Sequence, residues 1–202
     1  MPTPIDYYFA PQSPWAYLGH ARFTQLARDA GALVRVRPVD IGGQVFPVSG
    51  GLPLAKRAPQ RQAYRLLELK RYSRHLNLPL NVQPKYFPVA GDDAAKLIIA
   101  AEEAGGTDAA MQLSGRILAA VWAEERNIAS EATLAELLAE CGLPPALLEA
   151  SHSQAVHERY DAYTQQAIAA GVFGAPSFVI DGEIFWGQDR LDFVARRLGL
   201  VK

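Results

Sequence analysis

Cysteine is nearly absent from this chain of 202 residues, in which Cys141 is the single example. One cysteine excludes an intrachain disulfide, a dithiol redox centre and a cysteine-based zinc site. Cys141 lies in "LLAECGLPP", where a glycine and two prolines are suited to ending a helix, and a buried structural thiol is expected there. The four histidines have no metal-ligand spacing, so no metal site is predicted.

A surplus of charge is also missing, because 20 basic residues face 21 acidic ones and the formal net charge is −1. No lysine or arginine run exceeds local clusters such as "KRAPQR", which disfavours electrostatic binding of nucleic acid or of an anionic membrane. No segment approaches the roughly 18 uncharged apolar residues of a membrane span, and "MPTPIDYY" is unlike a signal peptide. These absences predict a soluble, cytoplasmic protein.

The pattern of apolar residues changes along the chain. It predicts strands at 5–9 and 33–39, joined by a helix that begins near Ser13 and ends at Gly31. Strand signals nearly vanish from about 46 to 165, where capped helical patterns dominate. This long middle part is therefore expected to be all helical.

Strand patterns return near the end of the chain. "APSFVIDGEIFWG" predicts two short strands joined by Asp181-Gly182, the dipeptide of a tight hairpin, and "DRLDFVARRLG" predicts a final helix. Because the first and last parts are each too small to bury a sheet alone, we expect them to join in one sheet. The predicted fold is α/β, with one discontinuous domain, 1–45 and 166–202, and an all-helical domain, 46–165, inserted into it.

The helix that begins at "SPWAY" carries the candidate reactive group. Serine is a favoured N-cap and proline suits the first helical position, so Ser13 and Pro14 have a purely structural explanation. The same geometry has a functional use, because a helix N-terminus offers unpaired amide donors and partial positive charge to an anion. A thiolate is such an anion, and without a cysteine at this place it has to come from an external thiol. The residues alone leave both interpretations open.

The layout resembles the thioredoxin-fold family whose bacterial disulfide-forming members carry a helical insertion. There the first helix begins Cys-Pro-x-Cys-Tyr, which "SPWAY" matches with Ser13 and Ala16 in place of the cysteines. More specifically, the chain resembles the glutathione-dependent 2-hydroxychromene-2-carboxylate isomerases and the related kappa-class glutathione transferases, in which a serine replaces the first cysteine. "GVFGAPSFVIDGEIFWGQDRL", "PKYFP" and "KRAPQRQAYRLLELKRY" extend the resemblance over nearly the whole chain. It implies a thioredoxin fold with an inserted all-helical domain.

The resemblance also implies a glutathione site and assigns its residues. Ser13 is implied to be catalytic and to contact the thiol of glutathione. Pro176 is expected to be the cis-proline that faces the active-site helix, and the backbone of Ala175 would pair with the cysteinyl part of glutathione. Asp189 would take the α-ammonium group, while Gln188 and its backbone amide would face the α-carboxylate. On residue types alone, Asp189 is equally explained as a favourable charge in the first turn of the last helix.

The substrate end of the site is predicted from "PKYFP", which is bracketed by prolines and therefore loop-like. Tyr86 and Phe87 are the candidates for contact with a flat aromatic substrate, and Lys85 for its carboxylate. The alternative for these aromatics, as for Trp122 and Trp186, is the ordinary core position of large rings.

Two positions depart from the family pattern. Many members have Gly-Asn-x-Pro where this chain has Gly50-Gly51-Leu52-Pro53, so an asparagine contact to bound ligand is absent. A lysine often found near the start of the following helix is Arg61 here.

The resemblance implies a glutathione-dependent isomerase that converts 2-hydroxychromene-2-carboxylate to trans-o-hydroxybenzylidenepyruvate in naphthalene-type aromatic degradation. Reversible thiolate addition would allow the rotation and regenerate glutathione, and a homodimer is expected. One alternative is a kappa-like transferase or peroxidase, which would consume glutathione. Another is a thioredoxin-fold protein that binds glutathione without turnover.

Overall fold

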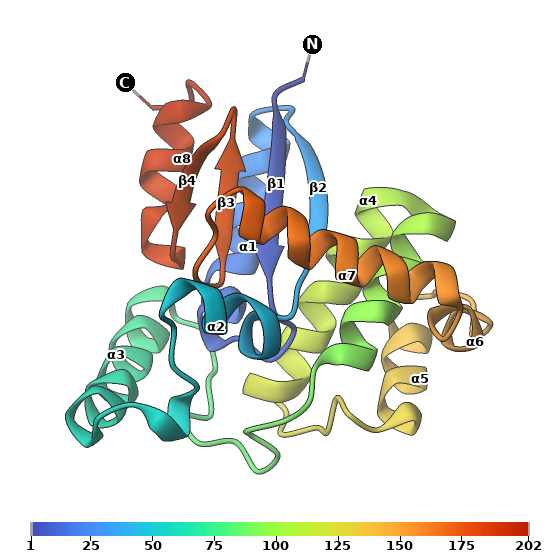
Figure 1. The fold of residues 1–202 in the computed structure, drawn as a ribbon, viewed down its shortest axis with the longest axis horizontal. Helices are drawn as coiled ribbons and strands as arrows, with labels where there is room; N and C mark the ends of the chain where they lie inside the picture. The colour runs from blue at the N-terminus through green and yellow to red at the C-terminus, as the bar shows by residue number, and fades with distance from the viewer. Residues whose placement is uncertain (1, 202) are drawn as a thin grey trace.

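A four-stranded mixed sheet forms the centre of the protein, whose computed structural model describes residues 2–201 (Figure 1). Its strands, in the spatial order β2-β1-β3-β4, are β1 (Pro4–Phe9), β2 (Leu33–Pro38), β3 (Ser177–Ile180) and β4 (Glu183–Trp186). β1 is parallel to β2 and antiparallel to β3, and β3 is antiparallel to β4. The first and last parts of the chain therefore share one sheet, as the sequence predicts.

Helices cover both faces of this sheet. α1 (Pro14–Asp29) connects β1 to its parallel neighbour β2, and it packs against α8 (Leu191–Arg197) near the end of the chain. In Figure 1, α1 lies behind the sheet, whereas α7 (Gln154–Ala169) crosses in front of it. The start of α1 thus lies at the end of β1, at an edge where the sheet meets the inserted helices.

Aromatic rings fill the space between the sheet and α1. The Tyr7 ring stacks on Phe178 with centroids 5.4 Å apart, and Phe23 of α1 lies 4.8 Å from Tyr7. His20 is buried beside them. Its Nε2 donates to the carbonyl oxygen of Met111 at 2.9 Å, which leaves Nδ1 to accept from the Tyr7 hydroxyl at 3.3 Å. Burial lowers the pKa of His20 to about 4, so this ring is neutral near pH 7.

The chain between β2 and β3 is helical throughout its regular structure. Gly106, with φ +74° and ψ −172°, kinks the longest of these helices. Within the described range, no helix combines the length and apolar character that crossing a bilayer requires. The elements of this part are a π-helix (Ile41–Val45), α2 (Phe46–Ser49), a 3-10 helix (Leu54–Lys56), α3 (Pro59–Leu76), α4 (Asp92–Trp122), α5 (Glu131–Glu140), α6 (Leu147–Ser151) and α7.

The predicted hairpin is confirmed, because β3 and β4 are joined by Asp181 (φ +50°) and Gly182 (φ +82°). Two consecutive left-handed residues are what the tight hairpin turn requires. The predicted edges of the helical part are less accurate. Helical structure begins at Ile41, and the boundary predicted after residue 165 falls inside α7 because nothing stops that helix before Gly171. The division into two domains stays a prediction.

Candidate active site

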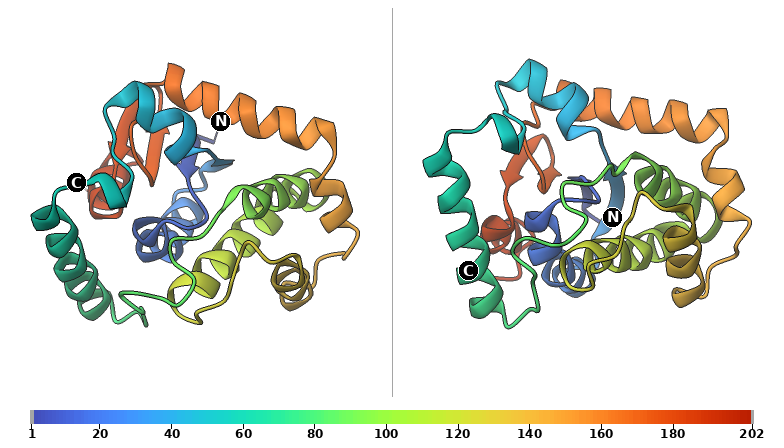
Figure 2. Two further views of the ribbon diagram at one scale, coloured as in Figure 1. Left: turned by 60° about the horizontal axis from the view of Figure 1, so that its bottom comes forward. Right: turned by 90° about the horizontal axis from the view of Figure 1, so that it is seen from below.

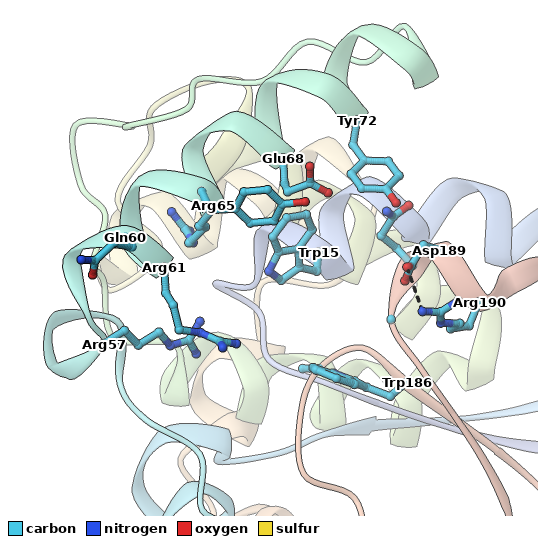
Figure 3. Close-up of a pocket in the computed structure, with 14 residues that line it drawn as sticks. Trp15, Arg57, Gln60, Arg61, Arg65, Glu68, Tyr72, Trp186, Asp189 and Arg190 are labelled. Carbon is cyan, nitrogen blue, oxygen red and sulfur yellow. Dashed lines mark ion pairs between the residues drawn. The ribbon is translucent and has the colours of Figure 1, made fainter.

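A cavity of about 550 Å³ opens beside the first turn of α1 (Figure 3). Trp15 of α1, residues from 57 to 72 and residues 175 and 186–190 line it. The helical part that includes α3 and the segments next to β3 and β4 therefore form different walls of one cavity. In both views of Figure 2, α3 lies on one side of the strands, with α5 and α6 on the other side.

Ser13 is the N-cap of α1. Its backbone is extended (φ −79°, ψ 122°), and its Oγ accepts a hydrogen bond from the Ala16 amide at 3.2 Å. The structural interpretation of Ser13 is thus confirmed. A hydroxyl that accepts one bond still has a proton to donate, so the cap does not exclude a contact with an anion. Ser13 itself is not among the cavity-lining residues, whereas its neighbour Trp15 is. A catalytic role for Ser13 stays a prediction.

The bond between Ala175 and Pro176 is cis, as expected from the resemblance. Ala175 lines the cavity, and the Pro176 carbonyl accepts a hydrogen bond from the Gly187 amide at 2.9 Å. Ser177 Oγ donates to the Gly174 carbonyl at 2.8 Å. These bonds hold the segment before β3 against the end of β4, with Ala175 facing the cavity.

The turn after β4 brings Gln188 and Asp189 to the cavity. The Asp189 carboxylate is partly exposed and forms an ion pair with Arg190 at 3.6 Å. Gln188 is only 2% exposed, and the guanidinium of Arg22 donates to its side-chain oxygen and, at 3.0 Å, to its backbone oxygen. The side chain of Gln188 therefore holds this turn on α1, and the ligand contact predicted for it stays untested.

Three arginines line the cavity on the side of α3: Arg57, Arg61 and Arg65. The sequence prediction noted only Arg61. None of the three forms an ion pair with a carboxylate in the part of the chain that the structure describes. In Figure 3, Arg57 and Arg61 point to the same part of the cavity. Arg61 and Arg65 are four residues apart within α3, a spacing that predicts a shared helix face, whereas Arg57 precedes the helix with extended backbone.

Burial and mutual repulsion act on these guanidinium groups. Burial, and then the charge of Arg61, lower the pKa of Arg57. Burial, and then the charge of Arg57, lower the pKa of Arg65 to about 10. Arg57 and Arg65 both remain protonated at neutral pH. Like charges gathered without a counter-ion among the described residues make this wall a strong candidate for binding carboxylates.

The glycine loop before α3 shapes the same wall. A Cβ added at Gly51 would lie 2.1 Å from the Phe46 ring, so this position, where the resemblance implies asparagine, is restricted to glycine by the ring. The Arg57 guanidinium lies over Phe46, 5.9 Å from the ring centre, and its Nε donates to the Leu52 carbonyl at 2.8 Å. The loop that lacks the asparagine thus positions an arginine.

The three residues predicted for the substrate are not brought to the cavity walls, as far as the described residues show. The Lys85 ammonium lies 5.0 Å from the centre of the Tyr86 ring, on the exposed loop. Phe87 packs against Trp122 at 4.8 Å and is linked to the cavity through Arg65, whose guanidinium lies 5.2 Å from the Phe87 ring. The substrate roles of Lys85, Tyr86 and Phe87 stay predictions.

Aromatic side chains make up much of the remaining wall. Trp15 meets Tyr72 edge-on at 6.2 Å, and Tyr64 and Trp186 complete the set. A core position is confirmed for Trp122, which is fully buried, but is wrong for Trp186, which is 50% exposed. Trp186 lies over Gly174, where an added Cβ would come 2.4 Å from its Nε1. The exposed position of Trp186 depends on its close contact with Gly174, and the presence of a tryptophan in the sequence does not predict that contact.

Comparisons with known proteins agree with this geometry. A family model described as "DSBA-like thioredoxin domain" matches residues 4–199. Two proteins named 2-hydroxychromene-2-carboxylate isomerase are similar over 96% of this chain: one from Sphingobium xenophagum (30% identical, 97% of its length) and one from Pseudomonas putida (28%, 94%). A solved structure of a 2-hydroxychromene-2-carboxylate isomerase superposes with a TM-score of 0.81 at 26% identity, covering 98% of this chain and 95% of that one.

Proposed function

Since the chain belongs to the DSBA-like thioredoxin domain family, we propose that it is a 2-hydroxychromene-2-carboxylate isomerase that uses glutathione as its cofactor. The similarity to proteins of that name extends over nearly the full length of both partners. The single observation that carries the proposal is the cavity beside the start of α1, with aromatic walls and three arginines that have no carboxylate partner among the described residues. An aromatic carboxylate fits such a surface.

The residues around the cavity fit glutathione in charge. Asp189 offers a carboxylate, 39% exposed, to the α-ammonium group. Arg57 and Arg61 offer guanidinium groups to the glycine carboxylate. Ala175 offers its backbone beside a cis-proline to the cysteinyl segment, in the manner of strand addition. This distribution supports glutathione as the cofactor.

Bound glutathione would supply a thiolate able to add reversibly to a conjugated carbon of the ring-opened substrate and so permit rotation about the former double bond. Ser13 would donate its hydroxyl proton as a hydrogen bond to the sulfur anion while its lone pair caps α1. The first turn of α1 adds its partial positive charge. Trp15 and Tyr72, which are in contact with each other, would exclude water from the flat substrate. The product is trans-o-hydroxybenzylidenepyruvate.

The finer assignments belong to the same proposal. We place the protein in the cytoplasm, in naphthalene-type aromatic degradation, and as a homodimer. The balanced charge and the single buried cysteine suit a reducing compartment. Light scattering coupled to gel filtration measures the oligomeric state directly.

An absorbance assay tests the function. Purified protein is mixed with 2-hydroxychromene-2-carboxylate with and without glutathione, and the glutathione consumed per substrate converted is measured. We expect conversion that requires glutathione and consumes none. One glutathione consumed per turnover would instead identify a kappa-like transferase or peroxidase. Glutathione binding without any turnover would identify a binding protein.

A further inference from the structure

Arg65 is a partly buried cation that forms no ion pair with any residue from 2 to 201. No carboxylate in residues 2–201 raises its pKa, and the other influence on it besides burial is the positive charge of Arg57. Placing a charge in a half-buried wall without a counter-ion costs free energy that an arriving anion would recover. Arg65 is therefore suited to a ligand carboxylate.

The surroundings of Arg65 connect it to the start of α1. Its guanidinium lies over two rings, 5.2 Å from the centre of Phe87 and 5.6 Å from that of Trp122. The indole Nε1 of Trp122 donates to the carbonyl of Gln12 at 3.3 Å, and Gln12 directly precedes Ser13. One aromatic residue thus separates Arg65 from the segment at which the sulfur would lie.

Stacking on rings leaves the edge of a guanidinium free. The five N–H donors lie in the plane of the group and match a carboxylate in a two-pronged contact. No described protein acceptor takes these donors, and none of the Arg65 nitrogens is among the buried atoms without a partner. The donors therefore face the cavity, where a ligand can reach them.

We propose that Arg65 binds the carboxylate of the aromatic substrate and that it makes the cavity selective for aromatic acids over uncharged aromatics. This inference rests on the proposed function and replaces Lys85 as the carboxylate partner. Lys85 lies on an exposed loop outside the cavity lining, whereas Arg65 lines the cavity and is linked through Trp122 to the reacting end of α1. Arg57 and Arg61 remain for the cofactor.

The test is a binding measurement with trans-cinnamate and its amide, trans-cinnamamide, which have the same ring and differ in charge. Quenching of tryptophan fluorescence reports binding, because Trp15 and Trp186 line the cavity. It is recorded with and without S-methylglutathione, which has no free thiol to react. We expect the parent to prefer the acid by about tenfold to a hundredfold, as for a charge-assisted contact. Arg65→Gln should bind acid and amide alike.

Two matched variants remove a positive charge elsewhere. Arg74→Gln changes an exposed arginine at the end of the same helix, and Lys85→Gln changes the residue favoured by the sequence. Both should keep the preference for the acid. If Lys85→Gln loses the preference and Arg65→Gln keeps it, the proposal is wrong. If thermal melts show that Arg65→Gln is unfolded, Arg65→Lys replaces it, and an undiminished preference in that variant contradicts the two-pronged contact.

Turnover of the chromene carboxylate by the parent is measured in parallel. Absent turnover together with an acid preference that depends on Arg65 would overturn the proposed function and leave this inference standing. Glutathione-dependent turnover together with equal binding of acid and amide by the parent would overturn this inference alone.

Discussion

Substitution of Ser13 separates the two roles of its hydroxyl group, as the N-cap of α1 and as the proposed hydrogen-bond donor to the sulfur anion. Its Oγ caps α1 by accepting from the Ala16 amide at 3.2 Å, at the long end of the range for such bonds. Ser13→Ala should therefore lose only about 0.5–1 kcal/mol of stability, in the lower half of measured cap effects. For a chain of this length, that loss lowers the melting temperature by about 1–4 °C.

The catalytic role predicts a much larger effect on rate. Loss of a hydrogen bond to a sulfur anion costs about 1.5–3 kcal/mol, or roughly ten- to 150-fold in kcat at saturating glutathione. Ser13→Asp tests the distinction further, because aspartate is as good an N-cap as serine but places a negative charge beside the thiolate. We expect its melting temperature to match that of the parent and its kcat to fall below that of Ser13→Ala.

The assays are initial rates of chromene carboxylate conversion and thermal melts without ligand. A kcat of Ser13→Ala within twofold of the parent, together with the small melting shift, would leave Ser13 as a helix cap only. An active Ser13→Asp would refute the idea that an anion lies at this position. Either result would move the sulfur away from the start of α1.

Three further predictions concern binding, reactivity and pH. Asp189→Asn should raise the KM for glutathione about three- to tenfold with kcat nearly unchanged, because the ammonium contact is distant from the reacting atoms and the carboxylate is partly exposed; an unaltered KM would contradict it. Cys141→Ser should keep its turnover, since burial raises the pKa of this thiol and Cys141 is not among the described residues that line the cavity; lost turnover in a folded variant would contradict the external thiol. The pKa of His20, about 4 in the folded protein, lies below the unfolded value of about 6.5. As the pH falls from 7 to 4, His20 should therefore lower the free energy of unfolding by about 3 kcal/mol. An NMR titration that shows the imidazole of the folded protein titrating near pH 6.5 would contradict this prediction.

Local signals made the framework of the fold predictable. Asp181-Gly182 specifies a tight hairpin because both residues tolerate left-handed backbone, and Ser13-Pro14 specifies a helix start because serine caps and proline fits the first turn. Such features depend on residues adjacent in the chain. The cis bond before Pro176 came from the family resemblance alone, since most such bonds are trans.

The walls of the site depend on contacts between residues that are distant in the sequence. Most of these contacts cannot be predicted from the sequence alone. Arg22 holds Gln188 across 166 positions, a contact that no local pattern predicts, and the ligand contact of Gln188 stays a prediction. The spacing of Arg61 and Arg65 indicates a common face of α3, but no pattern in the chain predicts that Arg57 joins them or which element that face meets. The loop of Lys85 was favoured because its composition suits a substrate, whereas its position depends on how it packs on α4.

α3 is attached to the rest of the protein by few buried side chains, which affects how the sequence of this protein can change in evolution. Of its 18 residues only Leu69 is buried, and the helix lies at the periphery in every view (Figures 1 and 2). Apart from Arg57 and Arg61, the parts that would hold the cofactor belong instead to the sheet, to the start of α1 and to the turn that Arg22 braces. If Arg65 binds the substrate as proposed, substitutions along α3 would alter the recognition of an aromatic acid at little cost in folding. In descendants of this gene, new substrates would be acquired through α3, while the turn that carries Asp189 and the start of α1 remain as they are.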